Sequence, residues 1–211
     1  MDNLVQHGGS GAEPEDIELV DGHLRLWRNW MTPAEASTLF DVLRDELAWE
    51  QSTVTIYGKR HRIPRLNAWY GDPGAGYRYS GTLFEPLPWT PSLSEVRARV
   101  EETTGHEFNG VLANCYRDGA DGVGWHSDDE PELGKNPVIA SVSLGSERRF
   151  SMKHKRRKDV SRCDLVLPSG SLLLMTGPTQ HHWVHQLPKT VRPVAERINL
   201  TFRLVVAGAD R

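Results

Sequence analysis

The sequence predicts an α+β domain in which two helices precede a barrel or jelly roll built from short strands. Two segments in the first half of the chain carry helix signals, and from about residue 108 short β-prone segments alternate with turns. Helices followed by a run of strands are typical of α+β domains, and many short strands are typical of barrels and jelly rolls. A chain of 211 residues is long enough for one such domain with a real core.

The chain begins with a polar, Gly-rich and acidic segment. Residues 1–22 contain six acids and neither Lys nor Arg, so the remainder is net positive although the whole chain carries a charge of −3. We expect a disordered acidic tail over residues 1–20, a single domain over residues 21–206 and a short tail over residues 207–211.

Two helices are expected ahead of the strands. The first, over residues 33–48, has Thr32 as its N-cap and Pro33 at the first helical position, and its leucines recur at helical spacing. The second, over residues 91–104, has Ser92 as its expected N-cap.

The remaining segments are expected to be strands and connections. Residues 53–57 predict a strand, and residues 71–90, rich in Gly, Pro and aromatic side chains, predict an ordered irregular loop. Further strands are expected over residues 110–117, 123–128, 138–145, 148–153, 163–167, 171–176, 182–187 and 196–206.

Composition favours a soluble globular protein in a reducing compartment. The chain is 38% hydrophobic and 25% charged, and no segment approaches the roughly 18 apolar residues of a membrane span. The N-terminus lacks the features of a signal peptide, and two cysteines are too few for a secreted disulfide scaffold. We expect a monomer in the cytoplasm, or in the nucleus of a eukaryote, with no membrane contact.

The net charge alone argues against a nucleic-acid partner, but its distribution does not. Basic residues gather in two runs, one over residues 59–65 and one over residues 148–162. They are Lys59, Arg60, Arg62 and Arg65, then Arg148, Arg149, Lys153, Lys155, Arg156, Arg157, Lys158 and Arg162. Such runs are typical of phosphate contact, and the alternative is an ordinary solvated surface.

A His and an Asp stand two residues apart, at His126 and Asp128, on an expected strand. Positions i and i+2 of a strand face the same way, so both side chains would point into one cavity. His185 on a later strand would complete a two-His, one-carboxylate set for non-haem Fe(II), with His181 and His182 as competing ligands. The alternative is an unrelated His beside an acid.

The last expected strand alternates strictly between apolar and polar side chains. Its polar face carries Arg197, Asn199, Thr201 and Arg203. If this face lies inside a barrel, the two guanidinium groups need anionic partners, and a dicarboxylate supplies two. The alternative is an edge strand with its polar face in water.

Asn114 and Tyr116 share one face of an earlier strand and could also bind a carboxylate, unless Tyr116 is an ordinary tyrosine at a sheet margin. Together, N-x-Y at 114–116, H-x-D-D-E at 126–130, the distal His185 and R-x-N-x-T-F-R at 197–203 resemble the AlkB family of DNA and RNA demethylases. The resemblance runs from about residue 53 to residue 206 and is closest to the homologues that repair duplex DNA.

The resemblance implies a catalytic domain with a double-stranded β-helix (jelly-roll) core over about residues 108–206 and a nucleotide-recognition lid over about residues 50–92. It implies that Fe(II) is held by His126, Asp128 and His185. It implies that 2-oxoglutarate is held by Asn114, Tyr116, Arg197, Asn199 and Arg203. In this scheme Arg203 binds the distal carboxylate and Arg197 lies near the iron-bound end.

On the substrate side, the resemblance implies that Tyr79 stacks on a flipped base and that Glu130 approaches its exocyclic amino group. Tyr57 stands at the hairpin tip where the duplex-DNA homologue has a phenylalanine finger. The implied substrate-binding set comprises Tyr57, Arg65, Tyr77, Tyr79, Asp129 and Glu130.

The implied reaction is oxidative removal of alkyl groups from bases such as 1-methyladenine and 3-methylcytosine. It uses Fe(II), 2-oxoglutarate and O₂ and releases formaldehyde, succinate and CO₂. Alkylated duplex DNA is the favoured substrate, with single-stranded DNA and RNA as alternatives. A barrel that binds metal and anion without turnover is the alternative from another class.

Overall fold

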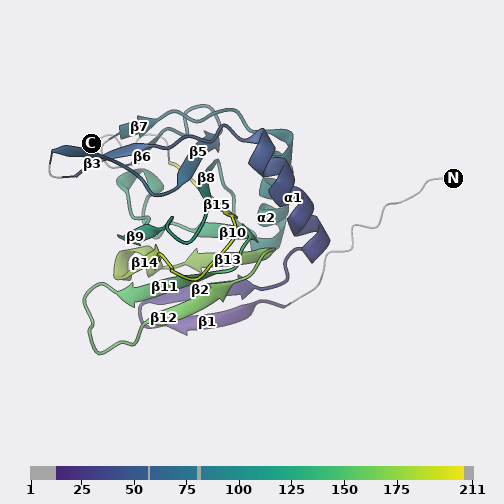
Figure 1. Ribbon diagram of the computed structural model, residues 1–211. Helices are drawn as coiled ribbons and strands as arrows, with labels where there is room; N and C mark the ends of the chain where they lie inside the picture. The colour runs from purple at the N-terminus through teal and green to yellow at the C-terminus, as the bar shows by residue number, and fades with distance from the viewer. Residues whose placement is uncertain (1–12, 57, 80–81, 207–211) are drawn as a thin grey trace.

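A computed structural model describes residues 13–56, 58–79 and 82–206, and it consists mainly of two antiparallel sheets that face each other (Figure 1). The larger sheet has the strand order β1-β2-β13-β10-β15-β8-β5, and the smaller has the order β12-β11-β14-β9. Two hairpins, β3-β4 and β6-β7, lie outside these sheets. This pair of sheets is the expected jelly-roll core.

The bounds of the strands are as follows. The large sheet contains β1 (Glu15–Leu19), β2 (Gly22–Trp27), β5 (Leu66–Gly71), β8 (Gly110–Tyr116), β10 (Ile139–Gly145), β13 (Ser171–Thr176) and β15 (Arg197–Arg203). The small sheet contains β9 (Val123–His126), β11 (Arg148–His154), β12 (Cys163–Leu167) and β14 (Trp183–Leu187). The hairpins are β3 (Thr53–Ile56) with β4 (Lys59–Arg62), and β6 (Tyr77–Tyr79) with β7 (Thr82–Phe84).

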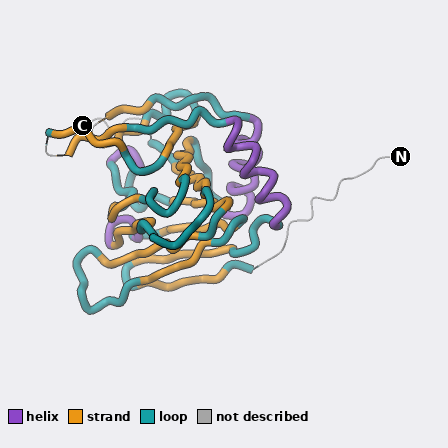
Figure 2. Tube along the Cα trace, in the orientation of Figure 1, coloured by secondary structure: helices purple, strands orange, loops and turns teal. Residues whose placement is uncertain are grey.

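Helices α1 (Pro33–Glu46) and α2 (Pro91–Thr104) cover the outer face of the large sheet (Figures 1 and 2). Their apolar sides pack on outward-facing residues of β8, β10, β13 and β15, such as Leu200 and Phe202. A short helix, α3 (Thr179–His182), and a 3-10 turn (Pro131–Leu133) complete the described helical segments. None of the helices in the described residues is long and apolar enough to cross a membrane.

The start of α1 confirms the expected cap, and the start of α2 corrects it. Thr32 accepts the N–H of Glu35, and the Glu35 carboxylate accepts the N–H of Thr32, which makes a complete capping box. In α2 the N-cap is Thr90, whose hydroxyl accepts the N–H of Leu93. The expected cap, Ser92, lies inside the helix because Pro91 occupies the first helical position.

Several strands lie where the sequence analysis did not expect them. Strand β1 falls within residues 1–20, so the expected disordered tail is wrong for Glu15–Leu19, which pair with β2. The segment 71–90, expected to be an irregular loop, contains the hairpin β6-β7. Strand β5 pairs with β8 along its whole length and so forms one edge of the large sheet.

The inner faces of the two sheets enclose both a second apolar core and a polar pocket. Side chains such as Met152, Trp183 and Leu173 fill the apolar part. Because β15 is covered by α1 and α2 on one face and by the small sheet on the other, all of its residues are buried. Its polar face therefore looks into the molecule, and the alternative of a solvent-exposed edge strand is excluded.

Candidate metal and co-substrate site

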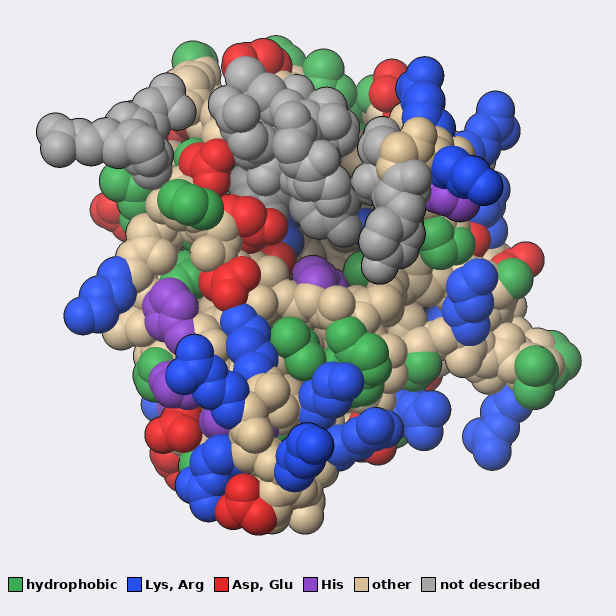
Figure 3. Space-filling model, turned by 90° about the vertical axis from the view of Figure 1, so that its left-hand side faces the viewer, with side chains coloured by type: hydrophobic (Ala, Val, Ile, Leu, Met, Phe, Trp, Pro, Cys, Tyr) green, Lys and Arg blue, Asp and Glu red, His purple; other side chains and the backbone are tan. Residues whose placement is uncertain are grey.

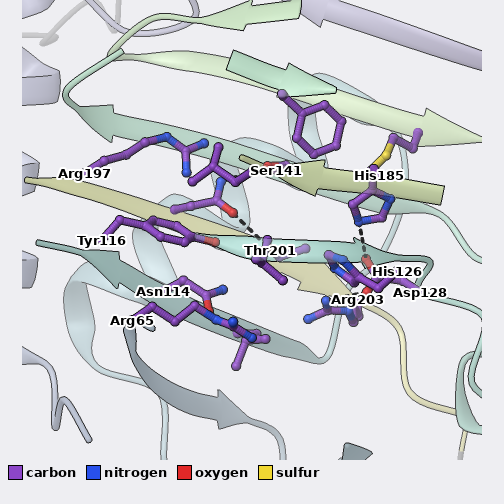
Figure 4. A pocket seen from close by; sticks show the side chains of 16 residues that line it. Arg65, Asn114, Tyr116, His126, Asp128, Ser141, His185, Arg197, Thr201 and Arg203 are labelled. Carbon is purple, nitrogen blue, oxygen red and sulfur yellow. Dashed lines mark hydrogen bonds and ion pairs between the residues drawn. The ribbon is translucent and has the colours of Figure 1, made fainter. Parts of the chain in front are cut away.

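Three side chains from separate segments meet at one end of this pocket (Figure 4). His126 ends β9, Asp128 lies in the loop that follows, and His185 stands opposite His126 on β14. Their ligand atoms lie within 4.8 Å of one another, and Asp128 Oδ2 is 3.9 Å from His185 Nε2. This set suits non-haem Fe(II), because it leaves coordination positions open. The three residues do come together, although Asp128 lies beyond the strand on which we expected it.

Burial and neighbouring charges set the protonation of these three residues. Burial is the largest influence on both imidazoles; it lowers the pKa of His126 and brings the pKa of His185 to about 3. Burial alone would raise the pKa of Asp128, but the charge and hydrogen bond of Arg203, together with electrostatic interaction with the two histidines, lower it to about 2. At neutral pH the site therefore presents two neutral imidazoles and a carboxylate, which are the forms that bind a cation.

A hydrogen bond orients His126 for metal binding. Its Nδ1 lies 2.8 Å from the carbonyl oxygen of Gly124, which can only accept, so Nδ1 carries the proton. The lone pair is then on Nε2, where it is available to a metal ion. The backbone of β9 thus selects the tautomer of its own terminal histidine.

A second group, Asp21, His154 and His182, also brings ligand atoms within 4.8 Å of one another. However, His154 Nδ1 accepts the N–H of Arg157 at 2.9 Å, so the proton is on Nε2, which lies 3.3 Å from Asp21 Oδ2. A nitrogen that carries a proton cannot bind a metal ion. His154 and Asp21 therefore form a structural pair that ties the end of β11 to the turn between β1 and β2.

Two buried arginines stand at opposite ends of the pocket (Figure 4). Arg203 Nη2 lies 2.9 Å from Asp128 Oδ1, so Arg203 is at the metal end. Arg197 is six residues away on the same strand, roughly 20 Å at the usual rise of a strand. It donates to Ser143 Oγ and lies over the ring of Tyr116. Arg203 is thus at the metal end and Arg197 at the far end, which is the reverse of the order that the resemblance implied.

Arg197 fits an anionic ligand. It is 2% exposed, and burial lowers its pKa to about 10. Its Nε has no hydrogen-bond partner among the described residues. A buried guanidinium with an unused donor is costly unless an anion joins it, and a carboxylate of 2-oxoglutarate has the matching charge and geometry.

The other expected co-substrate residues also line the pocket. Asn114 Oδ1 accepts the N–H of Arg65 Nε at 2.8 Å, which leaves the amide nitrogen of Asn114 to donate into the pocket. Tyr116 reaches in beside Arg197 (Figure 4). The Asn199 amide donates to Ser141 Oγ and Val142 O, so its N–H groups already serve to hold β15 against β10.

Arg65 was expected to lie on the surface with the other cations of residues 59–65, but the structure places it elsewhere. It is only 6% exposed, and it lines the pocket rather than the surface. The other three members of this run, on β4, are exposed. In the second run, Arg148 is also buried, and it donates to the carbonyl oxygens of Asp118, Asp121 and Pro188. Arg65 and Arg148 are thus unavailable for phosphate contact.

Most of the remaining cations of the second run are exposed. Lys and Arg spread over the lower part of the face shown in Figure 3, which is the side where the β11–β12 connection lies in Figure 1. Asp129 is paired with one of them, because Lys155 Nζ lies 2.7 Å from its Oδ2. Glu130, two residues after Asp128 in the chain, is half-buried. Tyr57 lies outside the described residues, and for Tyr77 and Tyr79 only the backbone is described, in β6.

Sequence reasoning missed Gln180, whose side chain accepts the N–H of Asp128. It also gave no role to Ser141 and Ser143, which bind Asn199 and Arg197. Alternation along 140–143 could have placed both serines on one face of a strand, opposite the polar face of β15. No comparable signal marks Gln180, because the contact joins a short helix to a loop.

Comparison with known proteins agrees with this geometry. Residues 23–203 match the model of the 2OG-Fe(II) oxygenase superfamily. The chain is 45% identical to mouse DNA oxidative demethylase ALKBH2, over 94% of this chain and 92% of that protein. It is 41% identical to human alpha-ketoglutarate-dependent dioxygenase alkB homolog 3, over 85% of this chain and 65% of that protein.

A solved structure, that of OsALKBH1, has the same fold with a TM-score of 0.61 and 16% identity; the match covers 90% of this chain and all of that one. The superfamily uses Fe(II), 2-oxoglutarate and O₂, and the His-Asp-His set of this pocket suits that metal. The chain is therefore a member of the 2OG-Fe(II) oxygenase superfamily and, within it, of the AlkB family.

Proposed function

We propose that this dioxygenase removes alkyl groups from N-alkylated bases of DNA, with 1-methyladenine and 3-methylcytosine as typical substrates. The observation that carries the proposal is the His-Asp-His set, with half-buried His126 and buried Asp128 and His185, in one pocket with two buried arginines. DNA as the substrate is supported by the names of the relatives, which include DNA oxidative demethylases at 44–45% identity.

His126, Asp128 and His185 would hold Fe(II), and Arg197 would bind the distal carboxylate of 2-oxoglutarate. When bound, the metal, 2-oxoglutarate and O₂ supply an oxidant that hydroxylates the alkyl carbon, so that formaldehyde, succinate and CO₂ leave and the normal base remains. Arg203 would act at the metal end, where it neutralises Asp128 and can face the other end of 2-oxoglutarate.

The protein's own contribution is orientation and the exclusion of water. Asn114, fixed by Arg65, can donate its amide hydrogens to the co-substrate. Apolar side chains, among them Phe150, Leu112 and Leu187, line the rest of the pocket and keep the oxidation away from bulk water.

The alkylated atom lies on the pairing edge of the base, so the base must leave the duplex to reach the pocket. Tyr79 would stack on it and Glu130 would face its amino group; both groups favour the positive charge of an N-methylated base. Tyr57 would fill the gap in the stack. Exposed cations on β4 and in the β11–β12 loop would contact phosphates without reading sequence.

The test is formaldehyde release from a methylated DNA duplex in the presence of Fe(II), 2-oxoglutarate and O₂. We expect release by the wild type and none by Asp128→Ala, because one carboxylate leaves the metal. The matched control is Asp164→Ala, an exposed aspartate on β12, which should retain full activity. Equal release by wild type and Asp128→Ala would overturn the ligand set. Failure of the wild type to form succinate under any condition would favour a non-catalytic binding protein.

The preference for duplex DNA needs its own comparison. The same lesion is offered in duplex DNA, single-stranded DNA and RNA, and the initial rates are compared at fixed salt. Faster turnover of the duplex is expected, and Tyr57→Ala should slow repair in the duplex more than in the single strand. Faster turnover of RNA or single-stranded DNA would show that this polymer, not duplex DNA, is the preferred substrate. The proposed dioxygenase reaction would still stand.

A further inference from the structure

The loop that follows β9 must hold Asp128 in place without hydrogen bonds of the sheet. Strand β9 ends at His126, whose partner in the sheet is His185. Asp128 comes two residues later and so lies beyond the end of the strand ladder. Yet its carboxylate must stay between Arg203 and the two imidazoles. Something other than the sheet has to hold this part of the chain.

Gln180 of α3 provides such a contact. Its Oε1 accepts the backbone N–H of Asp128 at 3.0 Å. Gln180 is 1% exposed, and its amide nitrogen lies 3.4 Å from the sulfur of Met175. Its side chain thus has little freedom to move, and it takes the place of a strand neighbour for Asp128.

Lys155 adds a second contact between α3 and the same loop. Its ammonium group donates to the backbone oxygen of Gln180 at 2.8 Å and to Asp129 Oδ2 at 2.7 Å. The backbone N–H of Lys155 also donates to His182 O. Lys155 therefore joins the β11–β12 loop, α3 and the residue next to Asp128.

We infer that Gln180 is a positioning residue for Asp128, and that Lys155 supports it by tying Asp129 to α3. The inference rests on the proposed ligand set. Partners that orient metal ligands usually matter for metal affinity, and their loss typically weakens binding by roughly 10- to 100-fold. Gln180→Met should have an effect of this order, because Met has a similar size but offers Asp128 no oxygen.

The experiment is an anaerobic titration of the metal-free full-length protein with Co(II), followed by visible absorption, after circular dichroism has shown that each variant is folded. Gln180→Met should raise the dissociation constant roughly tenfold or more. Gln180→Glu keeps an accepting oxygen and should recover part of the affinity. Gln186→Met, on the half-buried outer side of β14, is the matched control and should bind like the wild type. If the Met variant does not fold, Gln180→Asn gives the same test, because its oxygen is one carbon too short.

The outcomes separate this inference from the proposed function. If the wild type and Asp128→Ala bind Co(II) equally, the ligand set itself is wrong. If Asp128→Ala loses binding while folded Gln180→Met or Gln180→Asn binds like the wild type, Gln180 is merely structural. Lys155→Met should also weaken Co(II) binding, to a smaller extent because the lysine is partly exposed. Lys189→Met, at an exposed lysine outside both basic runs, is its control. If Lys155→Met weakens DNA binding but leaves Co(II) affinity unchanged, Lys155 contacts phosphate and does not support Asp128.

Discussion

At the scale of single residues, Arg197 and Arg203 carry the same charge but have different surroundings. Arg203 is paired with Asp128, whereas Arg197 donates to the neutral Ser143 and has an Nε that is unused within the described part of the chain. The sequence could place both on one face of a strand by alternation. It could not say which end of that strand meets the metal, because the answer depends on how β9 and β14 are folded against it.

The position of Arg197 leads to a prediction about the co-substrate. Arg197→Lys keeps a positive charge but loses the two-pronged pairing with a carboxylate, so the KM for 2-oxoglutarate should rise roughly tenfold or more. Co(II) affinity should stay unchanged, since Arg197 is far from the metal ligands. Steady-state succinate formation measures the first quantity. A normal KM together with a weakened metal affinity would contradict this placement. It would favour Arg203 at the distal carboxylate and Arg197 near the metal.

Arg65 illustrates why charge runs are hard to interpret from sequence. It follows three exposed cations in the chain, yet Pro64 and the turn into β5 carry it inward to Asn114. The run suggested four exposed cations that could contact phosphate, and in the structure three of the four are exposed. Burial of one member of a charge run is a tertiary effect, and spacing along the chain does not reveal it.

At the scale of secondary-structure elements, helices α1 and α2 and the strands after residue 108 were predictable because their signals are local, whereas the short helix α3 was missed. Capping and leucine spacing marked α1, and alternation marked β15. Strands β1 and β2 were missed, although Asp21-Gly22 between alternating apolar residues is a hairpin signal. Hairpin β6-β7 was missed because the segment around it, residues 71–90, is rich in Gly and Pro and therefore resembles a loop.

The capping box of α1 can be tested by its effect on stability. Thr32→Ala removes the acceptor for the N–H of Glu35 and should lower the free energy of unfolding by about 1 kcal/mol. Urea denaturation followed by circular dichroism measures it. Thr38→Ala, an exposed position within α1, is the control and should not destabilise. Equal stability of Thr32→Ala and wild type would show that the box contributes nothing.

At the scale of the whole molecule, the chemistry depends on two sheets brought face to face. The small sheet supplies His126 and His185, and the large sheet supplies Arg197, Arg203 and Asn114. Residues as far apart in the chain as Asn114 and Arg203 thus meet in one pocket. The identities of these residues could be inferred from motifs, but their distances and order depend on long-range packing.

The β3-β4 hairpin lies at the opposite side of the molecule from α1 (Figure 1), and β4 carries three exposed cations. Replacing Lys59, Arg60 and Arg62 by Ala should weaken binding to duplex DNA and reduce the slope of log K against log salt by about 0.9 for each phosphate that is no longer neutralised. Fluorescence anisotropy over a range of salt concentrations measures this slope. Arg44→Ala, an exposed cation on α1, should leave it unchanged. A slope that is equally steep in the triple variant would remove β4 from the DNA interface.

The most direct test of the whole account is mass spectrometry of a duplex oligonucleotide with one 1-methyladenine. The oligonucleotide is incubated with the protein, Fe(II), 2-oxoglutarate and air, in parallel with a reaction that omits 2-oxoglutarate. The account predicts that the methyl group is removed from the strand only in the complete reaction, with one succinate formed for each methyl group removed. An unchanged strand in the complete reaction, while 2-oxoglutarate is still converted to succinate, would contradict the proposal that this dioxygenase repairs DNA.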